Sequence, residues 1–123
     1  MSTRAHIIIK KKGEEDTYVY HHCDGYPDGV GEDLKRFIID EGTAEKPKSF
    51  ATLLNERDDY FRIDDGIHGD EEYIYYIDIY PDKVIISVET GEYIETADSD
   101  WEEIWKEIPE FTETIKTNVG SKR

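Results

Sequence analysis

The chain is 123 residues long and 12% aromatic, and it carries 30 acidic against 15 basic residues, a formal net charge of −15. This length suits one folded domain, and the aromatic content excludes the composition typical of disordered chains. The acidic balance argues against direct binding to nucleic acid or to an anionic membrane, because both require lysine and arginine to neutralise phosphates. Such a surface suits a basic protein partner or bound cations, and acidity that serves solubility alone is the more common interpretation. As a partner we expect a basic protein, with no direct contact to nucleic acid or membrane.

Basic residues gather at the two ends of the chain. Residues 1–12 and 116–123 hold 7 of the 15 basic residues and none of the acids, so residues 13–115 carry 8 basic and 30 acidic residues, net −22. The single cysteine, Cys23, cannot form an internal disulfide. We see no signal-peptide pattern and no apolar run of about 18 residues. These features predict a cytoplasmic protein with one domain over residues 1–123.

The first predicted elements are two strands joined by a polar turn that contains a glycine. Residues 5–11 are rich in isoleucine, and residues 17–22 combine tyrosine, valine and histidine, which favours strands in both. Pairing about the turn would put Arg4 roughly opposite Cys23 or Asp24. This register predicts an ion pair between Arg4 and Asp24.

Two helices are expected next. Leu34, Phe37 and Ile38 recur at helical spacing, acids occupy the first turn, and Gly42 ends the pattern as a left-handed cap. Pro47 lies near the start of the second helix. Its predicted apolar face holds three residues: Phe50, Leu53 and Leu54.

The middle of the chain predicts an acidic connector and then three strands. Within residues 55–72 we expect Tyr60, Phe61 and Ile63 to contact the core, as part of a short strand. Residues 73–80 are the strongest strand pattern, followed by strands at 83–90 and 93–96 with a turn at Gly91. In the first of these strands, alternate residues should meet the helices: Tyr73, Tyr75, Ile77 and Ile79. The opposite, tyrosine-bearing face of residues 74–80 is a candidate homodimer surface.

The last predicted element is a helix. Ser99 and Glu102 have the spacing of a capping box, and an apolar stripe at helical spacing follows: Trp101, Ile104, Trp105 and Ile108. Pro109 would end this helix, and residues 112–123 would form a flexible tail. The order strand-strand-helix-helix-strand-strand-strand-helix predicts an α+β domain, with a twisted antiparallel sheet of about five strands and its helices on one face.

Residues 22–34, called the elbow below, contain the densest group of glycines and prolines in the chain. Five side chains in or near it are candidates for ligand binding or interaction: Arg4, His22, Cys23, Asp24 and Tyr26. A metal site using the histidines, or a nucleophilic Cys23 with a histidine base, is one interpretation. The other is purely structural, with the glycines permitting positive φ and close packing. A phosphate-binding loop is disfavoured, because the elbow up to Gly31 has acids but no lysine, arginine, serine or threonine.

The connector contributes seven acids that form a candidate acidic surface: Asp58, Asp59, Asp64, Asp65, Asp70, Glu71 and Glu72. Their spacing does not match an EF-hand, so a solvated loop is the default interpretation and cation binding the alternative. No sequence motif specifies a cofactor, and we expect none.

Two segments of the first third of the chain resemble a known group. They are Ser2-Thr3-Arg4-Ala5-His6-Ile7-Ile8 and Tyr20-x-His22-x-Asp24-Gly25-Tyr26-Pro27-x-Gly29-x-Gly31-x-x-Leu34. This pattern resembles small uncharacterised proteins of phages, prophages and gut bacteria. The resemblance implies an accessory protein of a mobile element and carries no enzymatic activity with it.

Together these features favour a non-enzymatic interaction protein. Its partner would be a basic, nucleic-acid-binding protein of a host or phage, with carboxylates taking the place of phosphates. The alternative is a small-ligand domain, metal-binding domain or enzyme whose site lies at the elbow.

Overall fold

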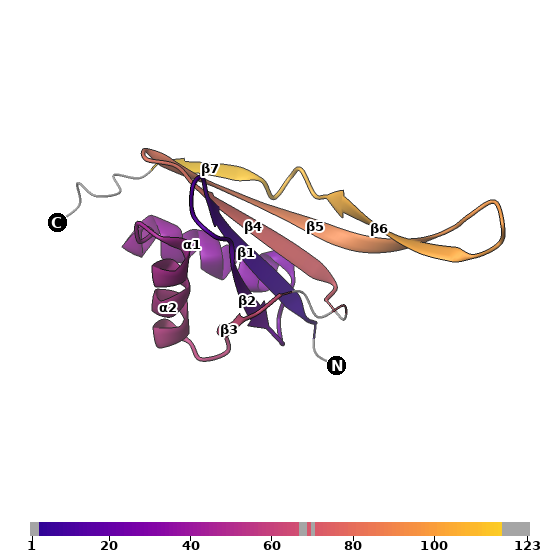
Figure 1. The fold of residues 1–123 in the computed structure, drawn as a ribbon, viewed down its shortest axis with the longest axis horizontal. Coiled ribbons are helices and arrows are strands. Elements are labelled where there is room, and N and C mark those ends of the chain that lie inside the picture. The colour runs from indigo at the N-terminus through magenta and orange to yellow at the C-terminus, as the bar shows by residue number, and fades with distance from the viewer. Residues whose placement is uncertain (1–2, 67–68, 70, 117–123) are drawn as a thin grey trace.

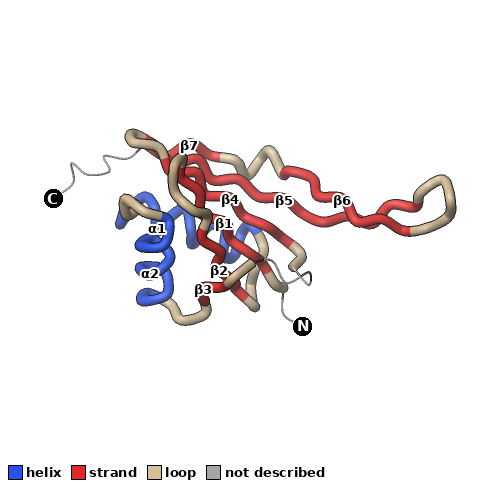
Figure 2. The backbone as a smooth tube through the Cα atoms, viewed as in Figure 1, coloured by secondary structure: helices blue, strands red, loops and turns tan. Residues whose placement is uncertain are grey.

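The computed structural model describes residues 3–66, 69 and 71–116. Its elements, in chain order, are β1 (Ala5–Lys11), β2 (Thr17–His21), a short π-helical turn η1 (Pro27–Gly31), α1 (Glu32–Glu41), α2 (Pro47–Arg57), β3 (Arg62–Asp64), β4 (Tyr73–Ile79), β5 (Lys83–Glu95), β6 (Trp101–Glu107) and β7 (Glu113–Lys116). The chain is a mixed α/β domain with one open sheet, and both α-helices cover the same face of it (Figures 1 and 2).

The sheet is larger than predicted and is not wholly antiparallel. In the described residues it has seven strands, in the order β3-β2-β1-β4-β5-β6, with β7 also paired to β5. The central pair, β1 and β4, is parallel, whereas the other pairs are antiparallel. Parallel neighbours need a long crossover, which the helices and β3 supply between the two strands. The first hairpin, both helices and the strand at 73–79 agree with the sequence prediction.

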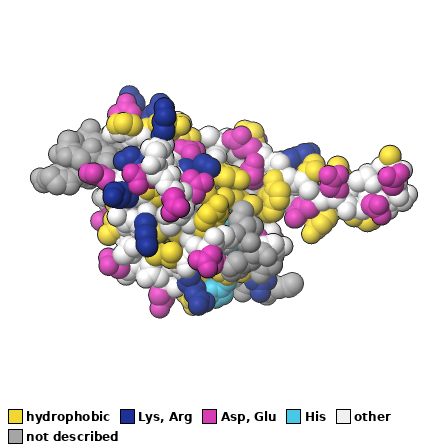
Figure 3. All heavy atoms as spheres, viewed as in Figure 1, with side chains coloured by type: hydrophobic (Ala, Val, Ile, Leu, Met, Phe, Trp, Pro, Cys, Tyr) yellow, Lys and Arg dark blue, Asp and Glu magenta, His cyan; other side chains and the backbone are white. Residues whose placement is uncertain are grey.

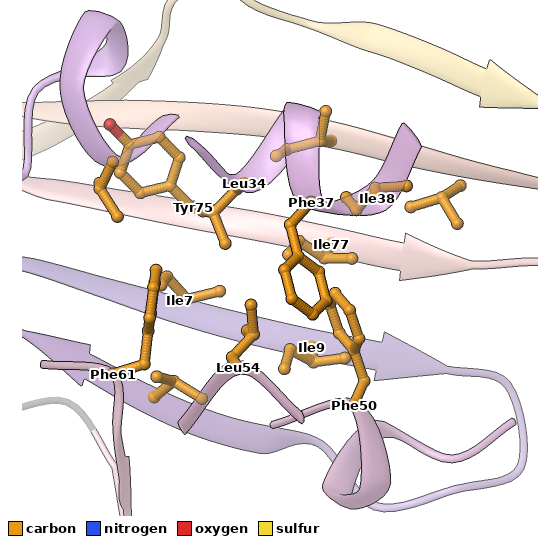
Figure 4. Close-up of a cluster of buried hydrophobic side chains, with 14 of the residues drawn as sticks. Ile7, Ile9, Leu34, Phe37, Ile38, Phe50, Leu54, Phe61, Tyr75 and Ile77 are labelled. Carbon is orange, nitrogen blue, oxygen red and sulfur yellow. The ribbon is translucent and has the colours of Figure 1, made fainter. Parts of the chain in front are cut away.

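The core lies between the helices and the alternating inward residues of the sheet. Tyr75 and Ile77 of β4 are fully buried there, next to Ile7 and Ile9 of β1, which confirms the predicted inner face of that strand. Phe37 of α1 and Phe50 of α2 meet across the same core with their ring centroids 5.6 Å apart (Figure 4). Burial of this apolar surface is the main force that holds the helices on the sheet.

Two predictions about the helices have different outcomes. Gly42 ends α1 as expected, with φ of 74° and its N–H donated to the Ile38 carbonyl. Leu53 was placed wrongly on the buried face of α2, because it is 40% exposed while Ala51 is fully buried. Residues 50, 51 and 54 lie on one side of a helix, and residue 53 lies at its margin.

The outer face of β4 is less open than predicted. Ile74 is buried, and the hydroxyl of Tyr76 donates a hydrogen bond to Glu89 at 2.9 Å. Burial, and after it this hydrogen bond, raises the pKa of Tyr76 to about 12. Tyr80, just beyond the strand, is exposed. A homodimer through this face stays a prediction.

The turn predicted at Gly91 is wrong. β5 runs through this position without a break, and Gly91 lies opposite Trp105 of β6. A Cβ added to Gly91 would lie 2.7 Å from a carboxylate oxygen of Glu103 and 3.3 Å from the Trp105 ring. Glycine therefore serves here as a site of close side-chain approach within a strand, not as a turn residue.

The predicted last helix is also wrong, because residues 101–107 form strand β6. The N–H of Thr96 bonds to the Asp100 carbonyl and the N–H of Ser99 to the Thr96 carbonyl, which closes a tight hairpin turn between β5 and β6. Ser99 has φ of 66°, so it occupies the left-handed position that often follows such a turn, and it does not cap a helix. Trp101 is 66% exposed, and of the four residues in the predicted stripe Ile108 packs against the core.

The prediction of a flexible tail from residue 112 is wrong for residues 113–116, which form strand β7. β7 pairs with the first residues of β5, and Phe111 before it is buried against Tyr75, with the ring centroids 5.6 Å apart. Residues 117–123 lie outside the described part of the chain.

The turn at Ser99 gives a direct test of the hairpin. Ser99→Gly should stabilise the turn by about 0.5–1 kcal/mol, because glycine adopts positive φ without the steric cost paid by serine. Amide hydrogen exchange of Thr96 should then slow about two- to fivefold. In a capped helix the same change would have little effect or would speed exchange, and that result would contradict the hairpin.

Candidate functional site

The elbow is held to the first strand by its backbone. The N–H of Gly25 donates to the Thr3 carbonyl at 3.0 Å, and the Gly25 carbonyl accepts a bond of 2.6 Å from the buried Tyr75 hydroxyl. Asp24 adopts φ of 51°, and its carbonyl accepts the N–H of Val30 at 2.9 Å. The positive φ expected of the elbow glycines is therefore found at Asp24, for which this conformation is among the more accessible.

The glycines of the elbow allow close packing. A Cβ on Gly25 would lie 2.9 Å from the Thr3 carbonyl oxygen, and one on Gly29 would lie 2.6 Å from the Asp24 carbonyl oxygen. A Cβ on Gly31 would lie 2.7 Å from the ring of Phe111. This geometry supports the structural interpretation of the glycines.

The five candidate side chains at the elbow do not converge on one enclosed site. Arg4 and Asp24 are exposed, and the register that pairs Ala5 with His21 puts Arg4 beside His22 and not beside Asp24. The Arg4–Asp24 ion pair stays a prediction. Burial, followed by the charge of Asp24, raises the pKa of the Cys23 thiol above its ordinary value, which disfavours the thiolate that a nucleophile requires.

His21, the neighbour of the candidate His22, is a buried structural residue. Its ring packs on Phe61 with centroids 4.6 Å apart, and its Nδ1 bonds to the Cys23 carbonyl. Burial lowers the pKa of His21, against an opposing contribution from that hydrogen bond and from the charge of Asp58.

The acidic connector is only partly a solvated surface. Asp59 and Asp65 are exposed, and Asp58 caps the chain after α2 by accepting the N–H of Tyr60 at 3.0 Å. Glu71, in contrast, is 5% exposed and bonds to Nδ1 of His6, which is fully buried. The solvated interpretation is therefore wrong for Glu71, because the fold puts it against a buried histidine from a distant strand.

The remaining acids of the connector have different surroundings. Asp64 lies 3.7 Å from Nε2 of His6, and Glu72 is exposed with its N–H bonded to the Arg4 carbonyl. Asp70 lies outside the described residues. Among the residues that the structure does describe, no three histidine, cysteine, aspartate or glutamate side chains are arranged to hold a metal ion.

A different part of the molecule has the features of an interaction surface. β4 begins at Tyr73, opposite Thr90, so from Gly91 onward the strand partner of β5 is β6, and the two form a ribbon that projects from the body (Figures 1 and 2). We call residues 91–105 the arm. They include six carboxylates and no lysine or arginine, together with three aromatic residues and two isoleucines.

The arm exposes large aromatic side chains. Tyr93 is 68% exposed and Trp101 66%, and Figure 3 shows hydrophobic and acidic side chains next to one another along the arm. The register puts Tyr93, Trp101 and Trp105 on one face of the ribbon. Exposed tryptophan and tyrosine on a two-stranded ribbon are typical of a surface that a partner covers, since they are the residues most enriched at interface hot spots.

A polar cavity of about 370 Å³ opens where the arm leaves the body. Tyr26, Tyr73 and Tyr93 contribute to its wall, and so do Glu72 and Glu103. Burial, and after it the charge of Glu72, raises the pKa of Tyr73. Of the five elbow candidates, Tyr26 is the one that reaches this cavity.

The sequence prediction missed the arm because it placed residues 93–96 in a short separate strand and the residues after Ser99 in a core-facing helix. Trp101, Ile104 and Trp105 have helical spacing, and this spacing was given more weight than the turn pattern that precedes them. The cluster Thr96-Ala97-Asp98-Ser99-Asp100 between two apolar-containing runs is a turn pattern, and it could have indicated a hairpin.

Comparison of the chain with protein-family models, with curated proteins and with solved structures finds no match. Within the described residues, neither α-helix is long and apolar enough to cross a membrane.

The packing role of the elbow predicts the effect of one methyl group. Gly25→Ala should lower the free energy of unfolding by about 1–3 kcal/mol, because its Cβ would collide with the Thr3 backbone and with Ala5. Gly66→Ala is the matched control, since an added Cβ there meets no atom within 4 Å. Urea denaturation measures both, and equal stability of the two variants would contradict a packing role.

The buried His21 predicts a pH dependence of stability. The unfolded chain takes up a proton on His21 near the ordinary pKa of 6.5, whereas the folded chain resists it until a lower pH. The unfolded state then binds more protons, so the free energy of unfolding should fall as pH is lowered from about 7.5 to 5.5. His21→Gln should reduce this slope in urea titrations at several pH values, and an unchanged slope would contradict the assignment.

Proposed function

We propose that this chain is a non-enzymatic interaction protein that binds a basic, nucleic-acid-binding protein through its arm. The observation that carries the proposal is the exposure of Tyr93 and Trp101 among six carboxylates with no basic residue in the arm. The carboxylates attract a basic surface over a distance and take the place of phosphates, while the aromatic rings supply the buried contact area.

The rest of the molecule supports a role in presenting the arm. The arm includes the second half of β5. The first half of β5 is paired on one side with β4 and on the other side with β7. Tyr93 therefore lies on a strand that is anchored in the core, and Trp101 and Trp105 lie on β6, which is paired to that strand. The resemblance of the first third to phage and prophage proteins fits an accessory protein of a mobile element that acts on a host or phage protein.

A small-ligand site at the elbow receives less support. The elbow backbone is used for packing against β1, and of its candidate residues Tyr26 alone lines the cavity at the root of the arm. The raised pKa of Cys23 disfavours covalent catalysis there.

The proposal predicts capture of basic proteins that depends on the arm. Wild-type chain immobilised on a resin should retain basic nucleic-acid-binding proteins from a bacterial lysate, and one retained protein, once purified, should bind directly with an affinity that falls as salt rises from 50 to 300 mM. The double variant Tyr93→Ala/Trp101→Ala should bind more than about tenfold more weakly, the loss expected for hot-spot residues.

The control variant is Tyr80→Ala, which removes an exposed tyrosine just beyond β4, away from the arm. It should bind as the wild type does. Retention of basic proteins that is equally strong for the double variant, or no retention of basic proteins at all, would contradict the proposal.

A further inference from the structure

Each exposed ring on the arm has a carboxylate directly across the ribbon. Tyr93 of β5 pairs with Glu103 of β6, and Trp101 of β6 pairs with Glu95 of β5. Directly opposite residues of antiparallel strands have their Cβ atoms about 4.5–5.5 Å apart and project to the same side. A guanidinium or ammonium group placed over either ring therefore also reaches a carboxylate, which combines a cation–π contact with a charge-assisted hydrogen bond.

The two ring–carboxylate pairs repeat along the ribbon at the spacing of alternate strand residues. Tyr93 and Glu95 are two residues apart on β5, as are Trp101 and Glu103 on β6, so the pairs lie about 6.8 Å apart along the strand direction. An extended peptide presents every second side chain on one side with the same repeat. The spacing of the ring–carboxylate pairs on the arm therefore equals the spacing of alternate side chains in an extended peptide.

A third position follows at the root of the arm. Glu103 leans over Gly91 toward Trp105, since its carboxylate oxygen would lie 2.7 Å from a Cβ at Gly91. Tyr93 and Glu103 also line the cavity of about 370 Å³, where Glu72 adds a further acid. The row of rings and carboxylates therefore continues from the ribbon into a hollow that can accept a side chain.

We propose that the arm binds an extended segment with basic residues at alternate positions, laid along the face that carries Tyr93, Trp101 and Trp105. This inference rests on the proposed function and names the form of the partner. Arginine fits best, because its planar guanidinium stacks on aromatic rings and binds carboxylates through two parallel bonds.

Charge identifies the occupant as a different, basic chain. A second copy of the arm would bring six carboxylates and no lysine or arginine to an arm that already has six, two of them, Glu95 and Glu103, on the face with the rings, so two arms repel one another. Nucleic acid has the same sign of charge and would be repelled in the same way. A basic segment is the complement that both the rings and the carboxylates favour.

The test uses the two tryptophans of the chain, Trp101 and Trp105, which both lie on β6 and report binding through their fluorescence. The full chain is titrated with a seven-residue peptide of serine with arginine at positions two, four and six. An isomeric peptide has its three arginines in a contiguous run, and a third peptide has citrulline in place of arginine. The alternating peptide should bind at least fivefold more tightly than its isomer, and the citrulline peptide should not bind.

Variants locate the contact. Tyr93→Ala should weaken binding of the alternating peptide about three- to thirtyfold, the range for loss of a cation–π contact, and Glu95→Gln should weaken it as well. Tyr80→Ala should bind as the wild type does. Binding of Trp101→Ala is followed by isothermal titration calorimetry, which does not need the lost fluorophore, and circular dichroism checks that each variant keeps the fold.

The outcomes separate this inference from the proposed function. Equal affinity for the two arginine isomers, lost in the Tyr93 and Trp101 variants, would overturn the alternating segment while leaving a basic partner for the arm. No binding of either arginine peptide, together with no arm-dependent capture of a basic protein, would overturn both. A concentration-dependent dimer in analytical ultracentrifugation that Trp101→Ala abolishes would overturn the assignment to a different chain.

Discussion

The arm depends on one strand that is longer than its neighbour. β5 has 13 residues, and β4 covers it only as far as Thr90. In the first half of β5, Val84, Ile86 and Val88 are buried in the core and the backbone is paired to β4 and β7, so the direction and twist of this half are set by the body of the domain. The second half keeps that direction without β4 beside it and carries β6 outward with it. Tyr93 is thereby presented by an anchored strand, and Trp101 and Trp105 by the strand paired to it, which lowers the conformational entropy that binding must remove.

The elbow has a structural role in the body of the domain from which the arm projects. It turns the chain from the edge of β2 into α1 and packs so closely on β1 that Gly25 leaves no room for a Cβ. The hydroxyl of Tyr75 in β4 donates a hydrogen bond to the Gly25 carbonyl. Phe111, just before β7, packs against both Tyr75 and Gly31. The elbow, the central strands and the segment leading to β7 are therefore one packed unit.

The acidic surplus of the chain has two different uses. In the connector, Glu71 is buried against His6, where it contributes to the packing of the outer face of the sheet. In the arm, the carboxylates lie among exposed rings, and residues 91–105 include no lysine or arginine. Net charge alone gives information about solubility and association, and none about which partner is bound. Its placement beside Tyr93 and Trp101 is what connects it to a particular kind of partner.

Residues 1–60 were largely predictable, because a local hairpin, a glycine-capped helix ending at Gly42 and a proline-initiated helix all depend on short-range patterns. The inner face of β4 was equally clear from its alternation. The structure of residues 91–107 could not be predicted in the same way. Trp101, Ile104 and Trp105 have helical spacing, and it is the pairing with β5 that makes this segment a strand. The parallel β1–β4 pair and the burial of Glu71 against His6 also join residues more than 60 positions apart. Such contacts are set by tertiary packing, which overrides local propensity and leaves no trace in a short sequence window.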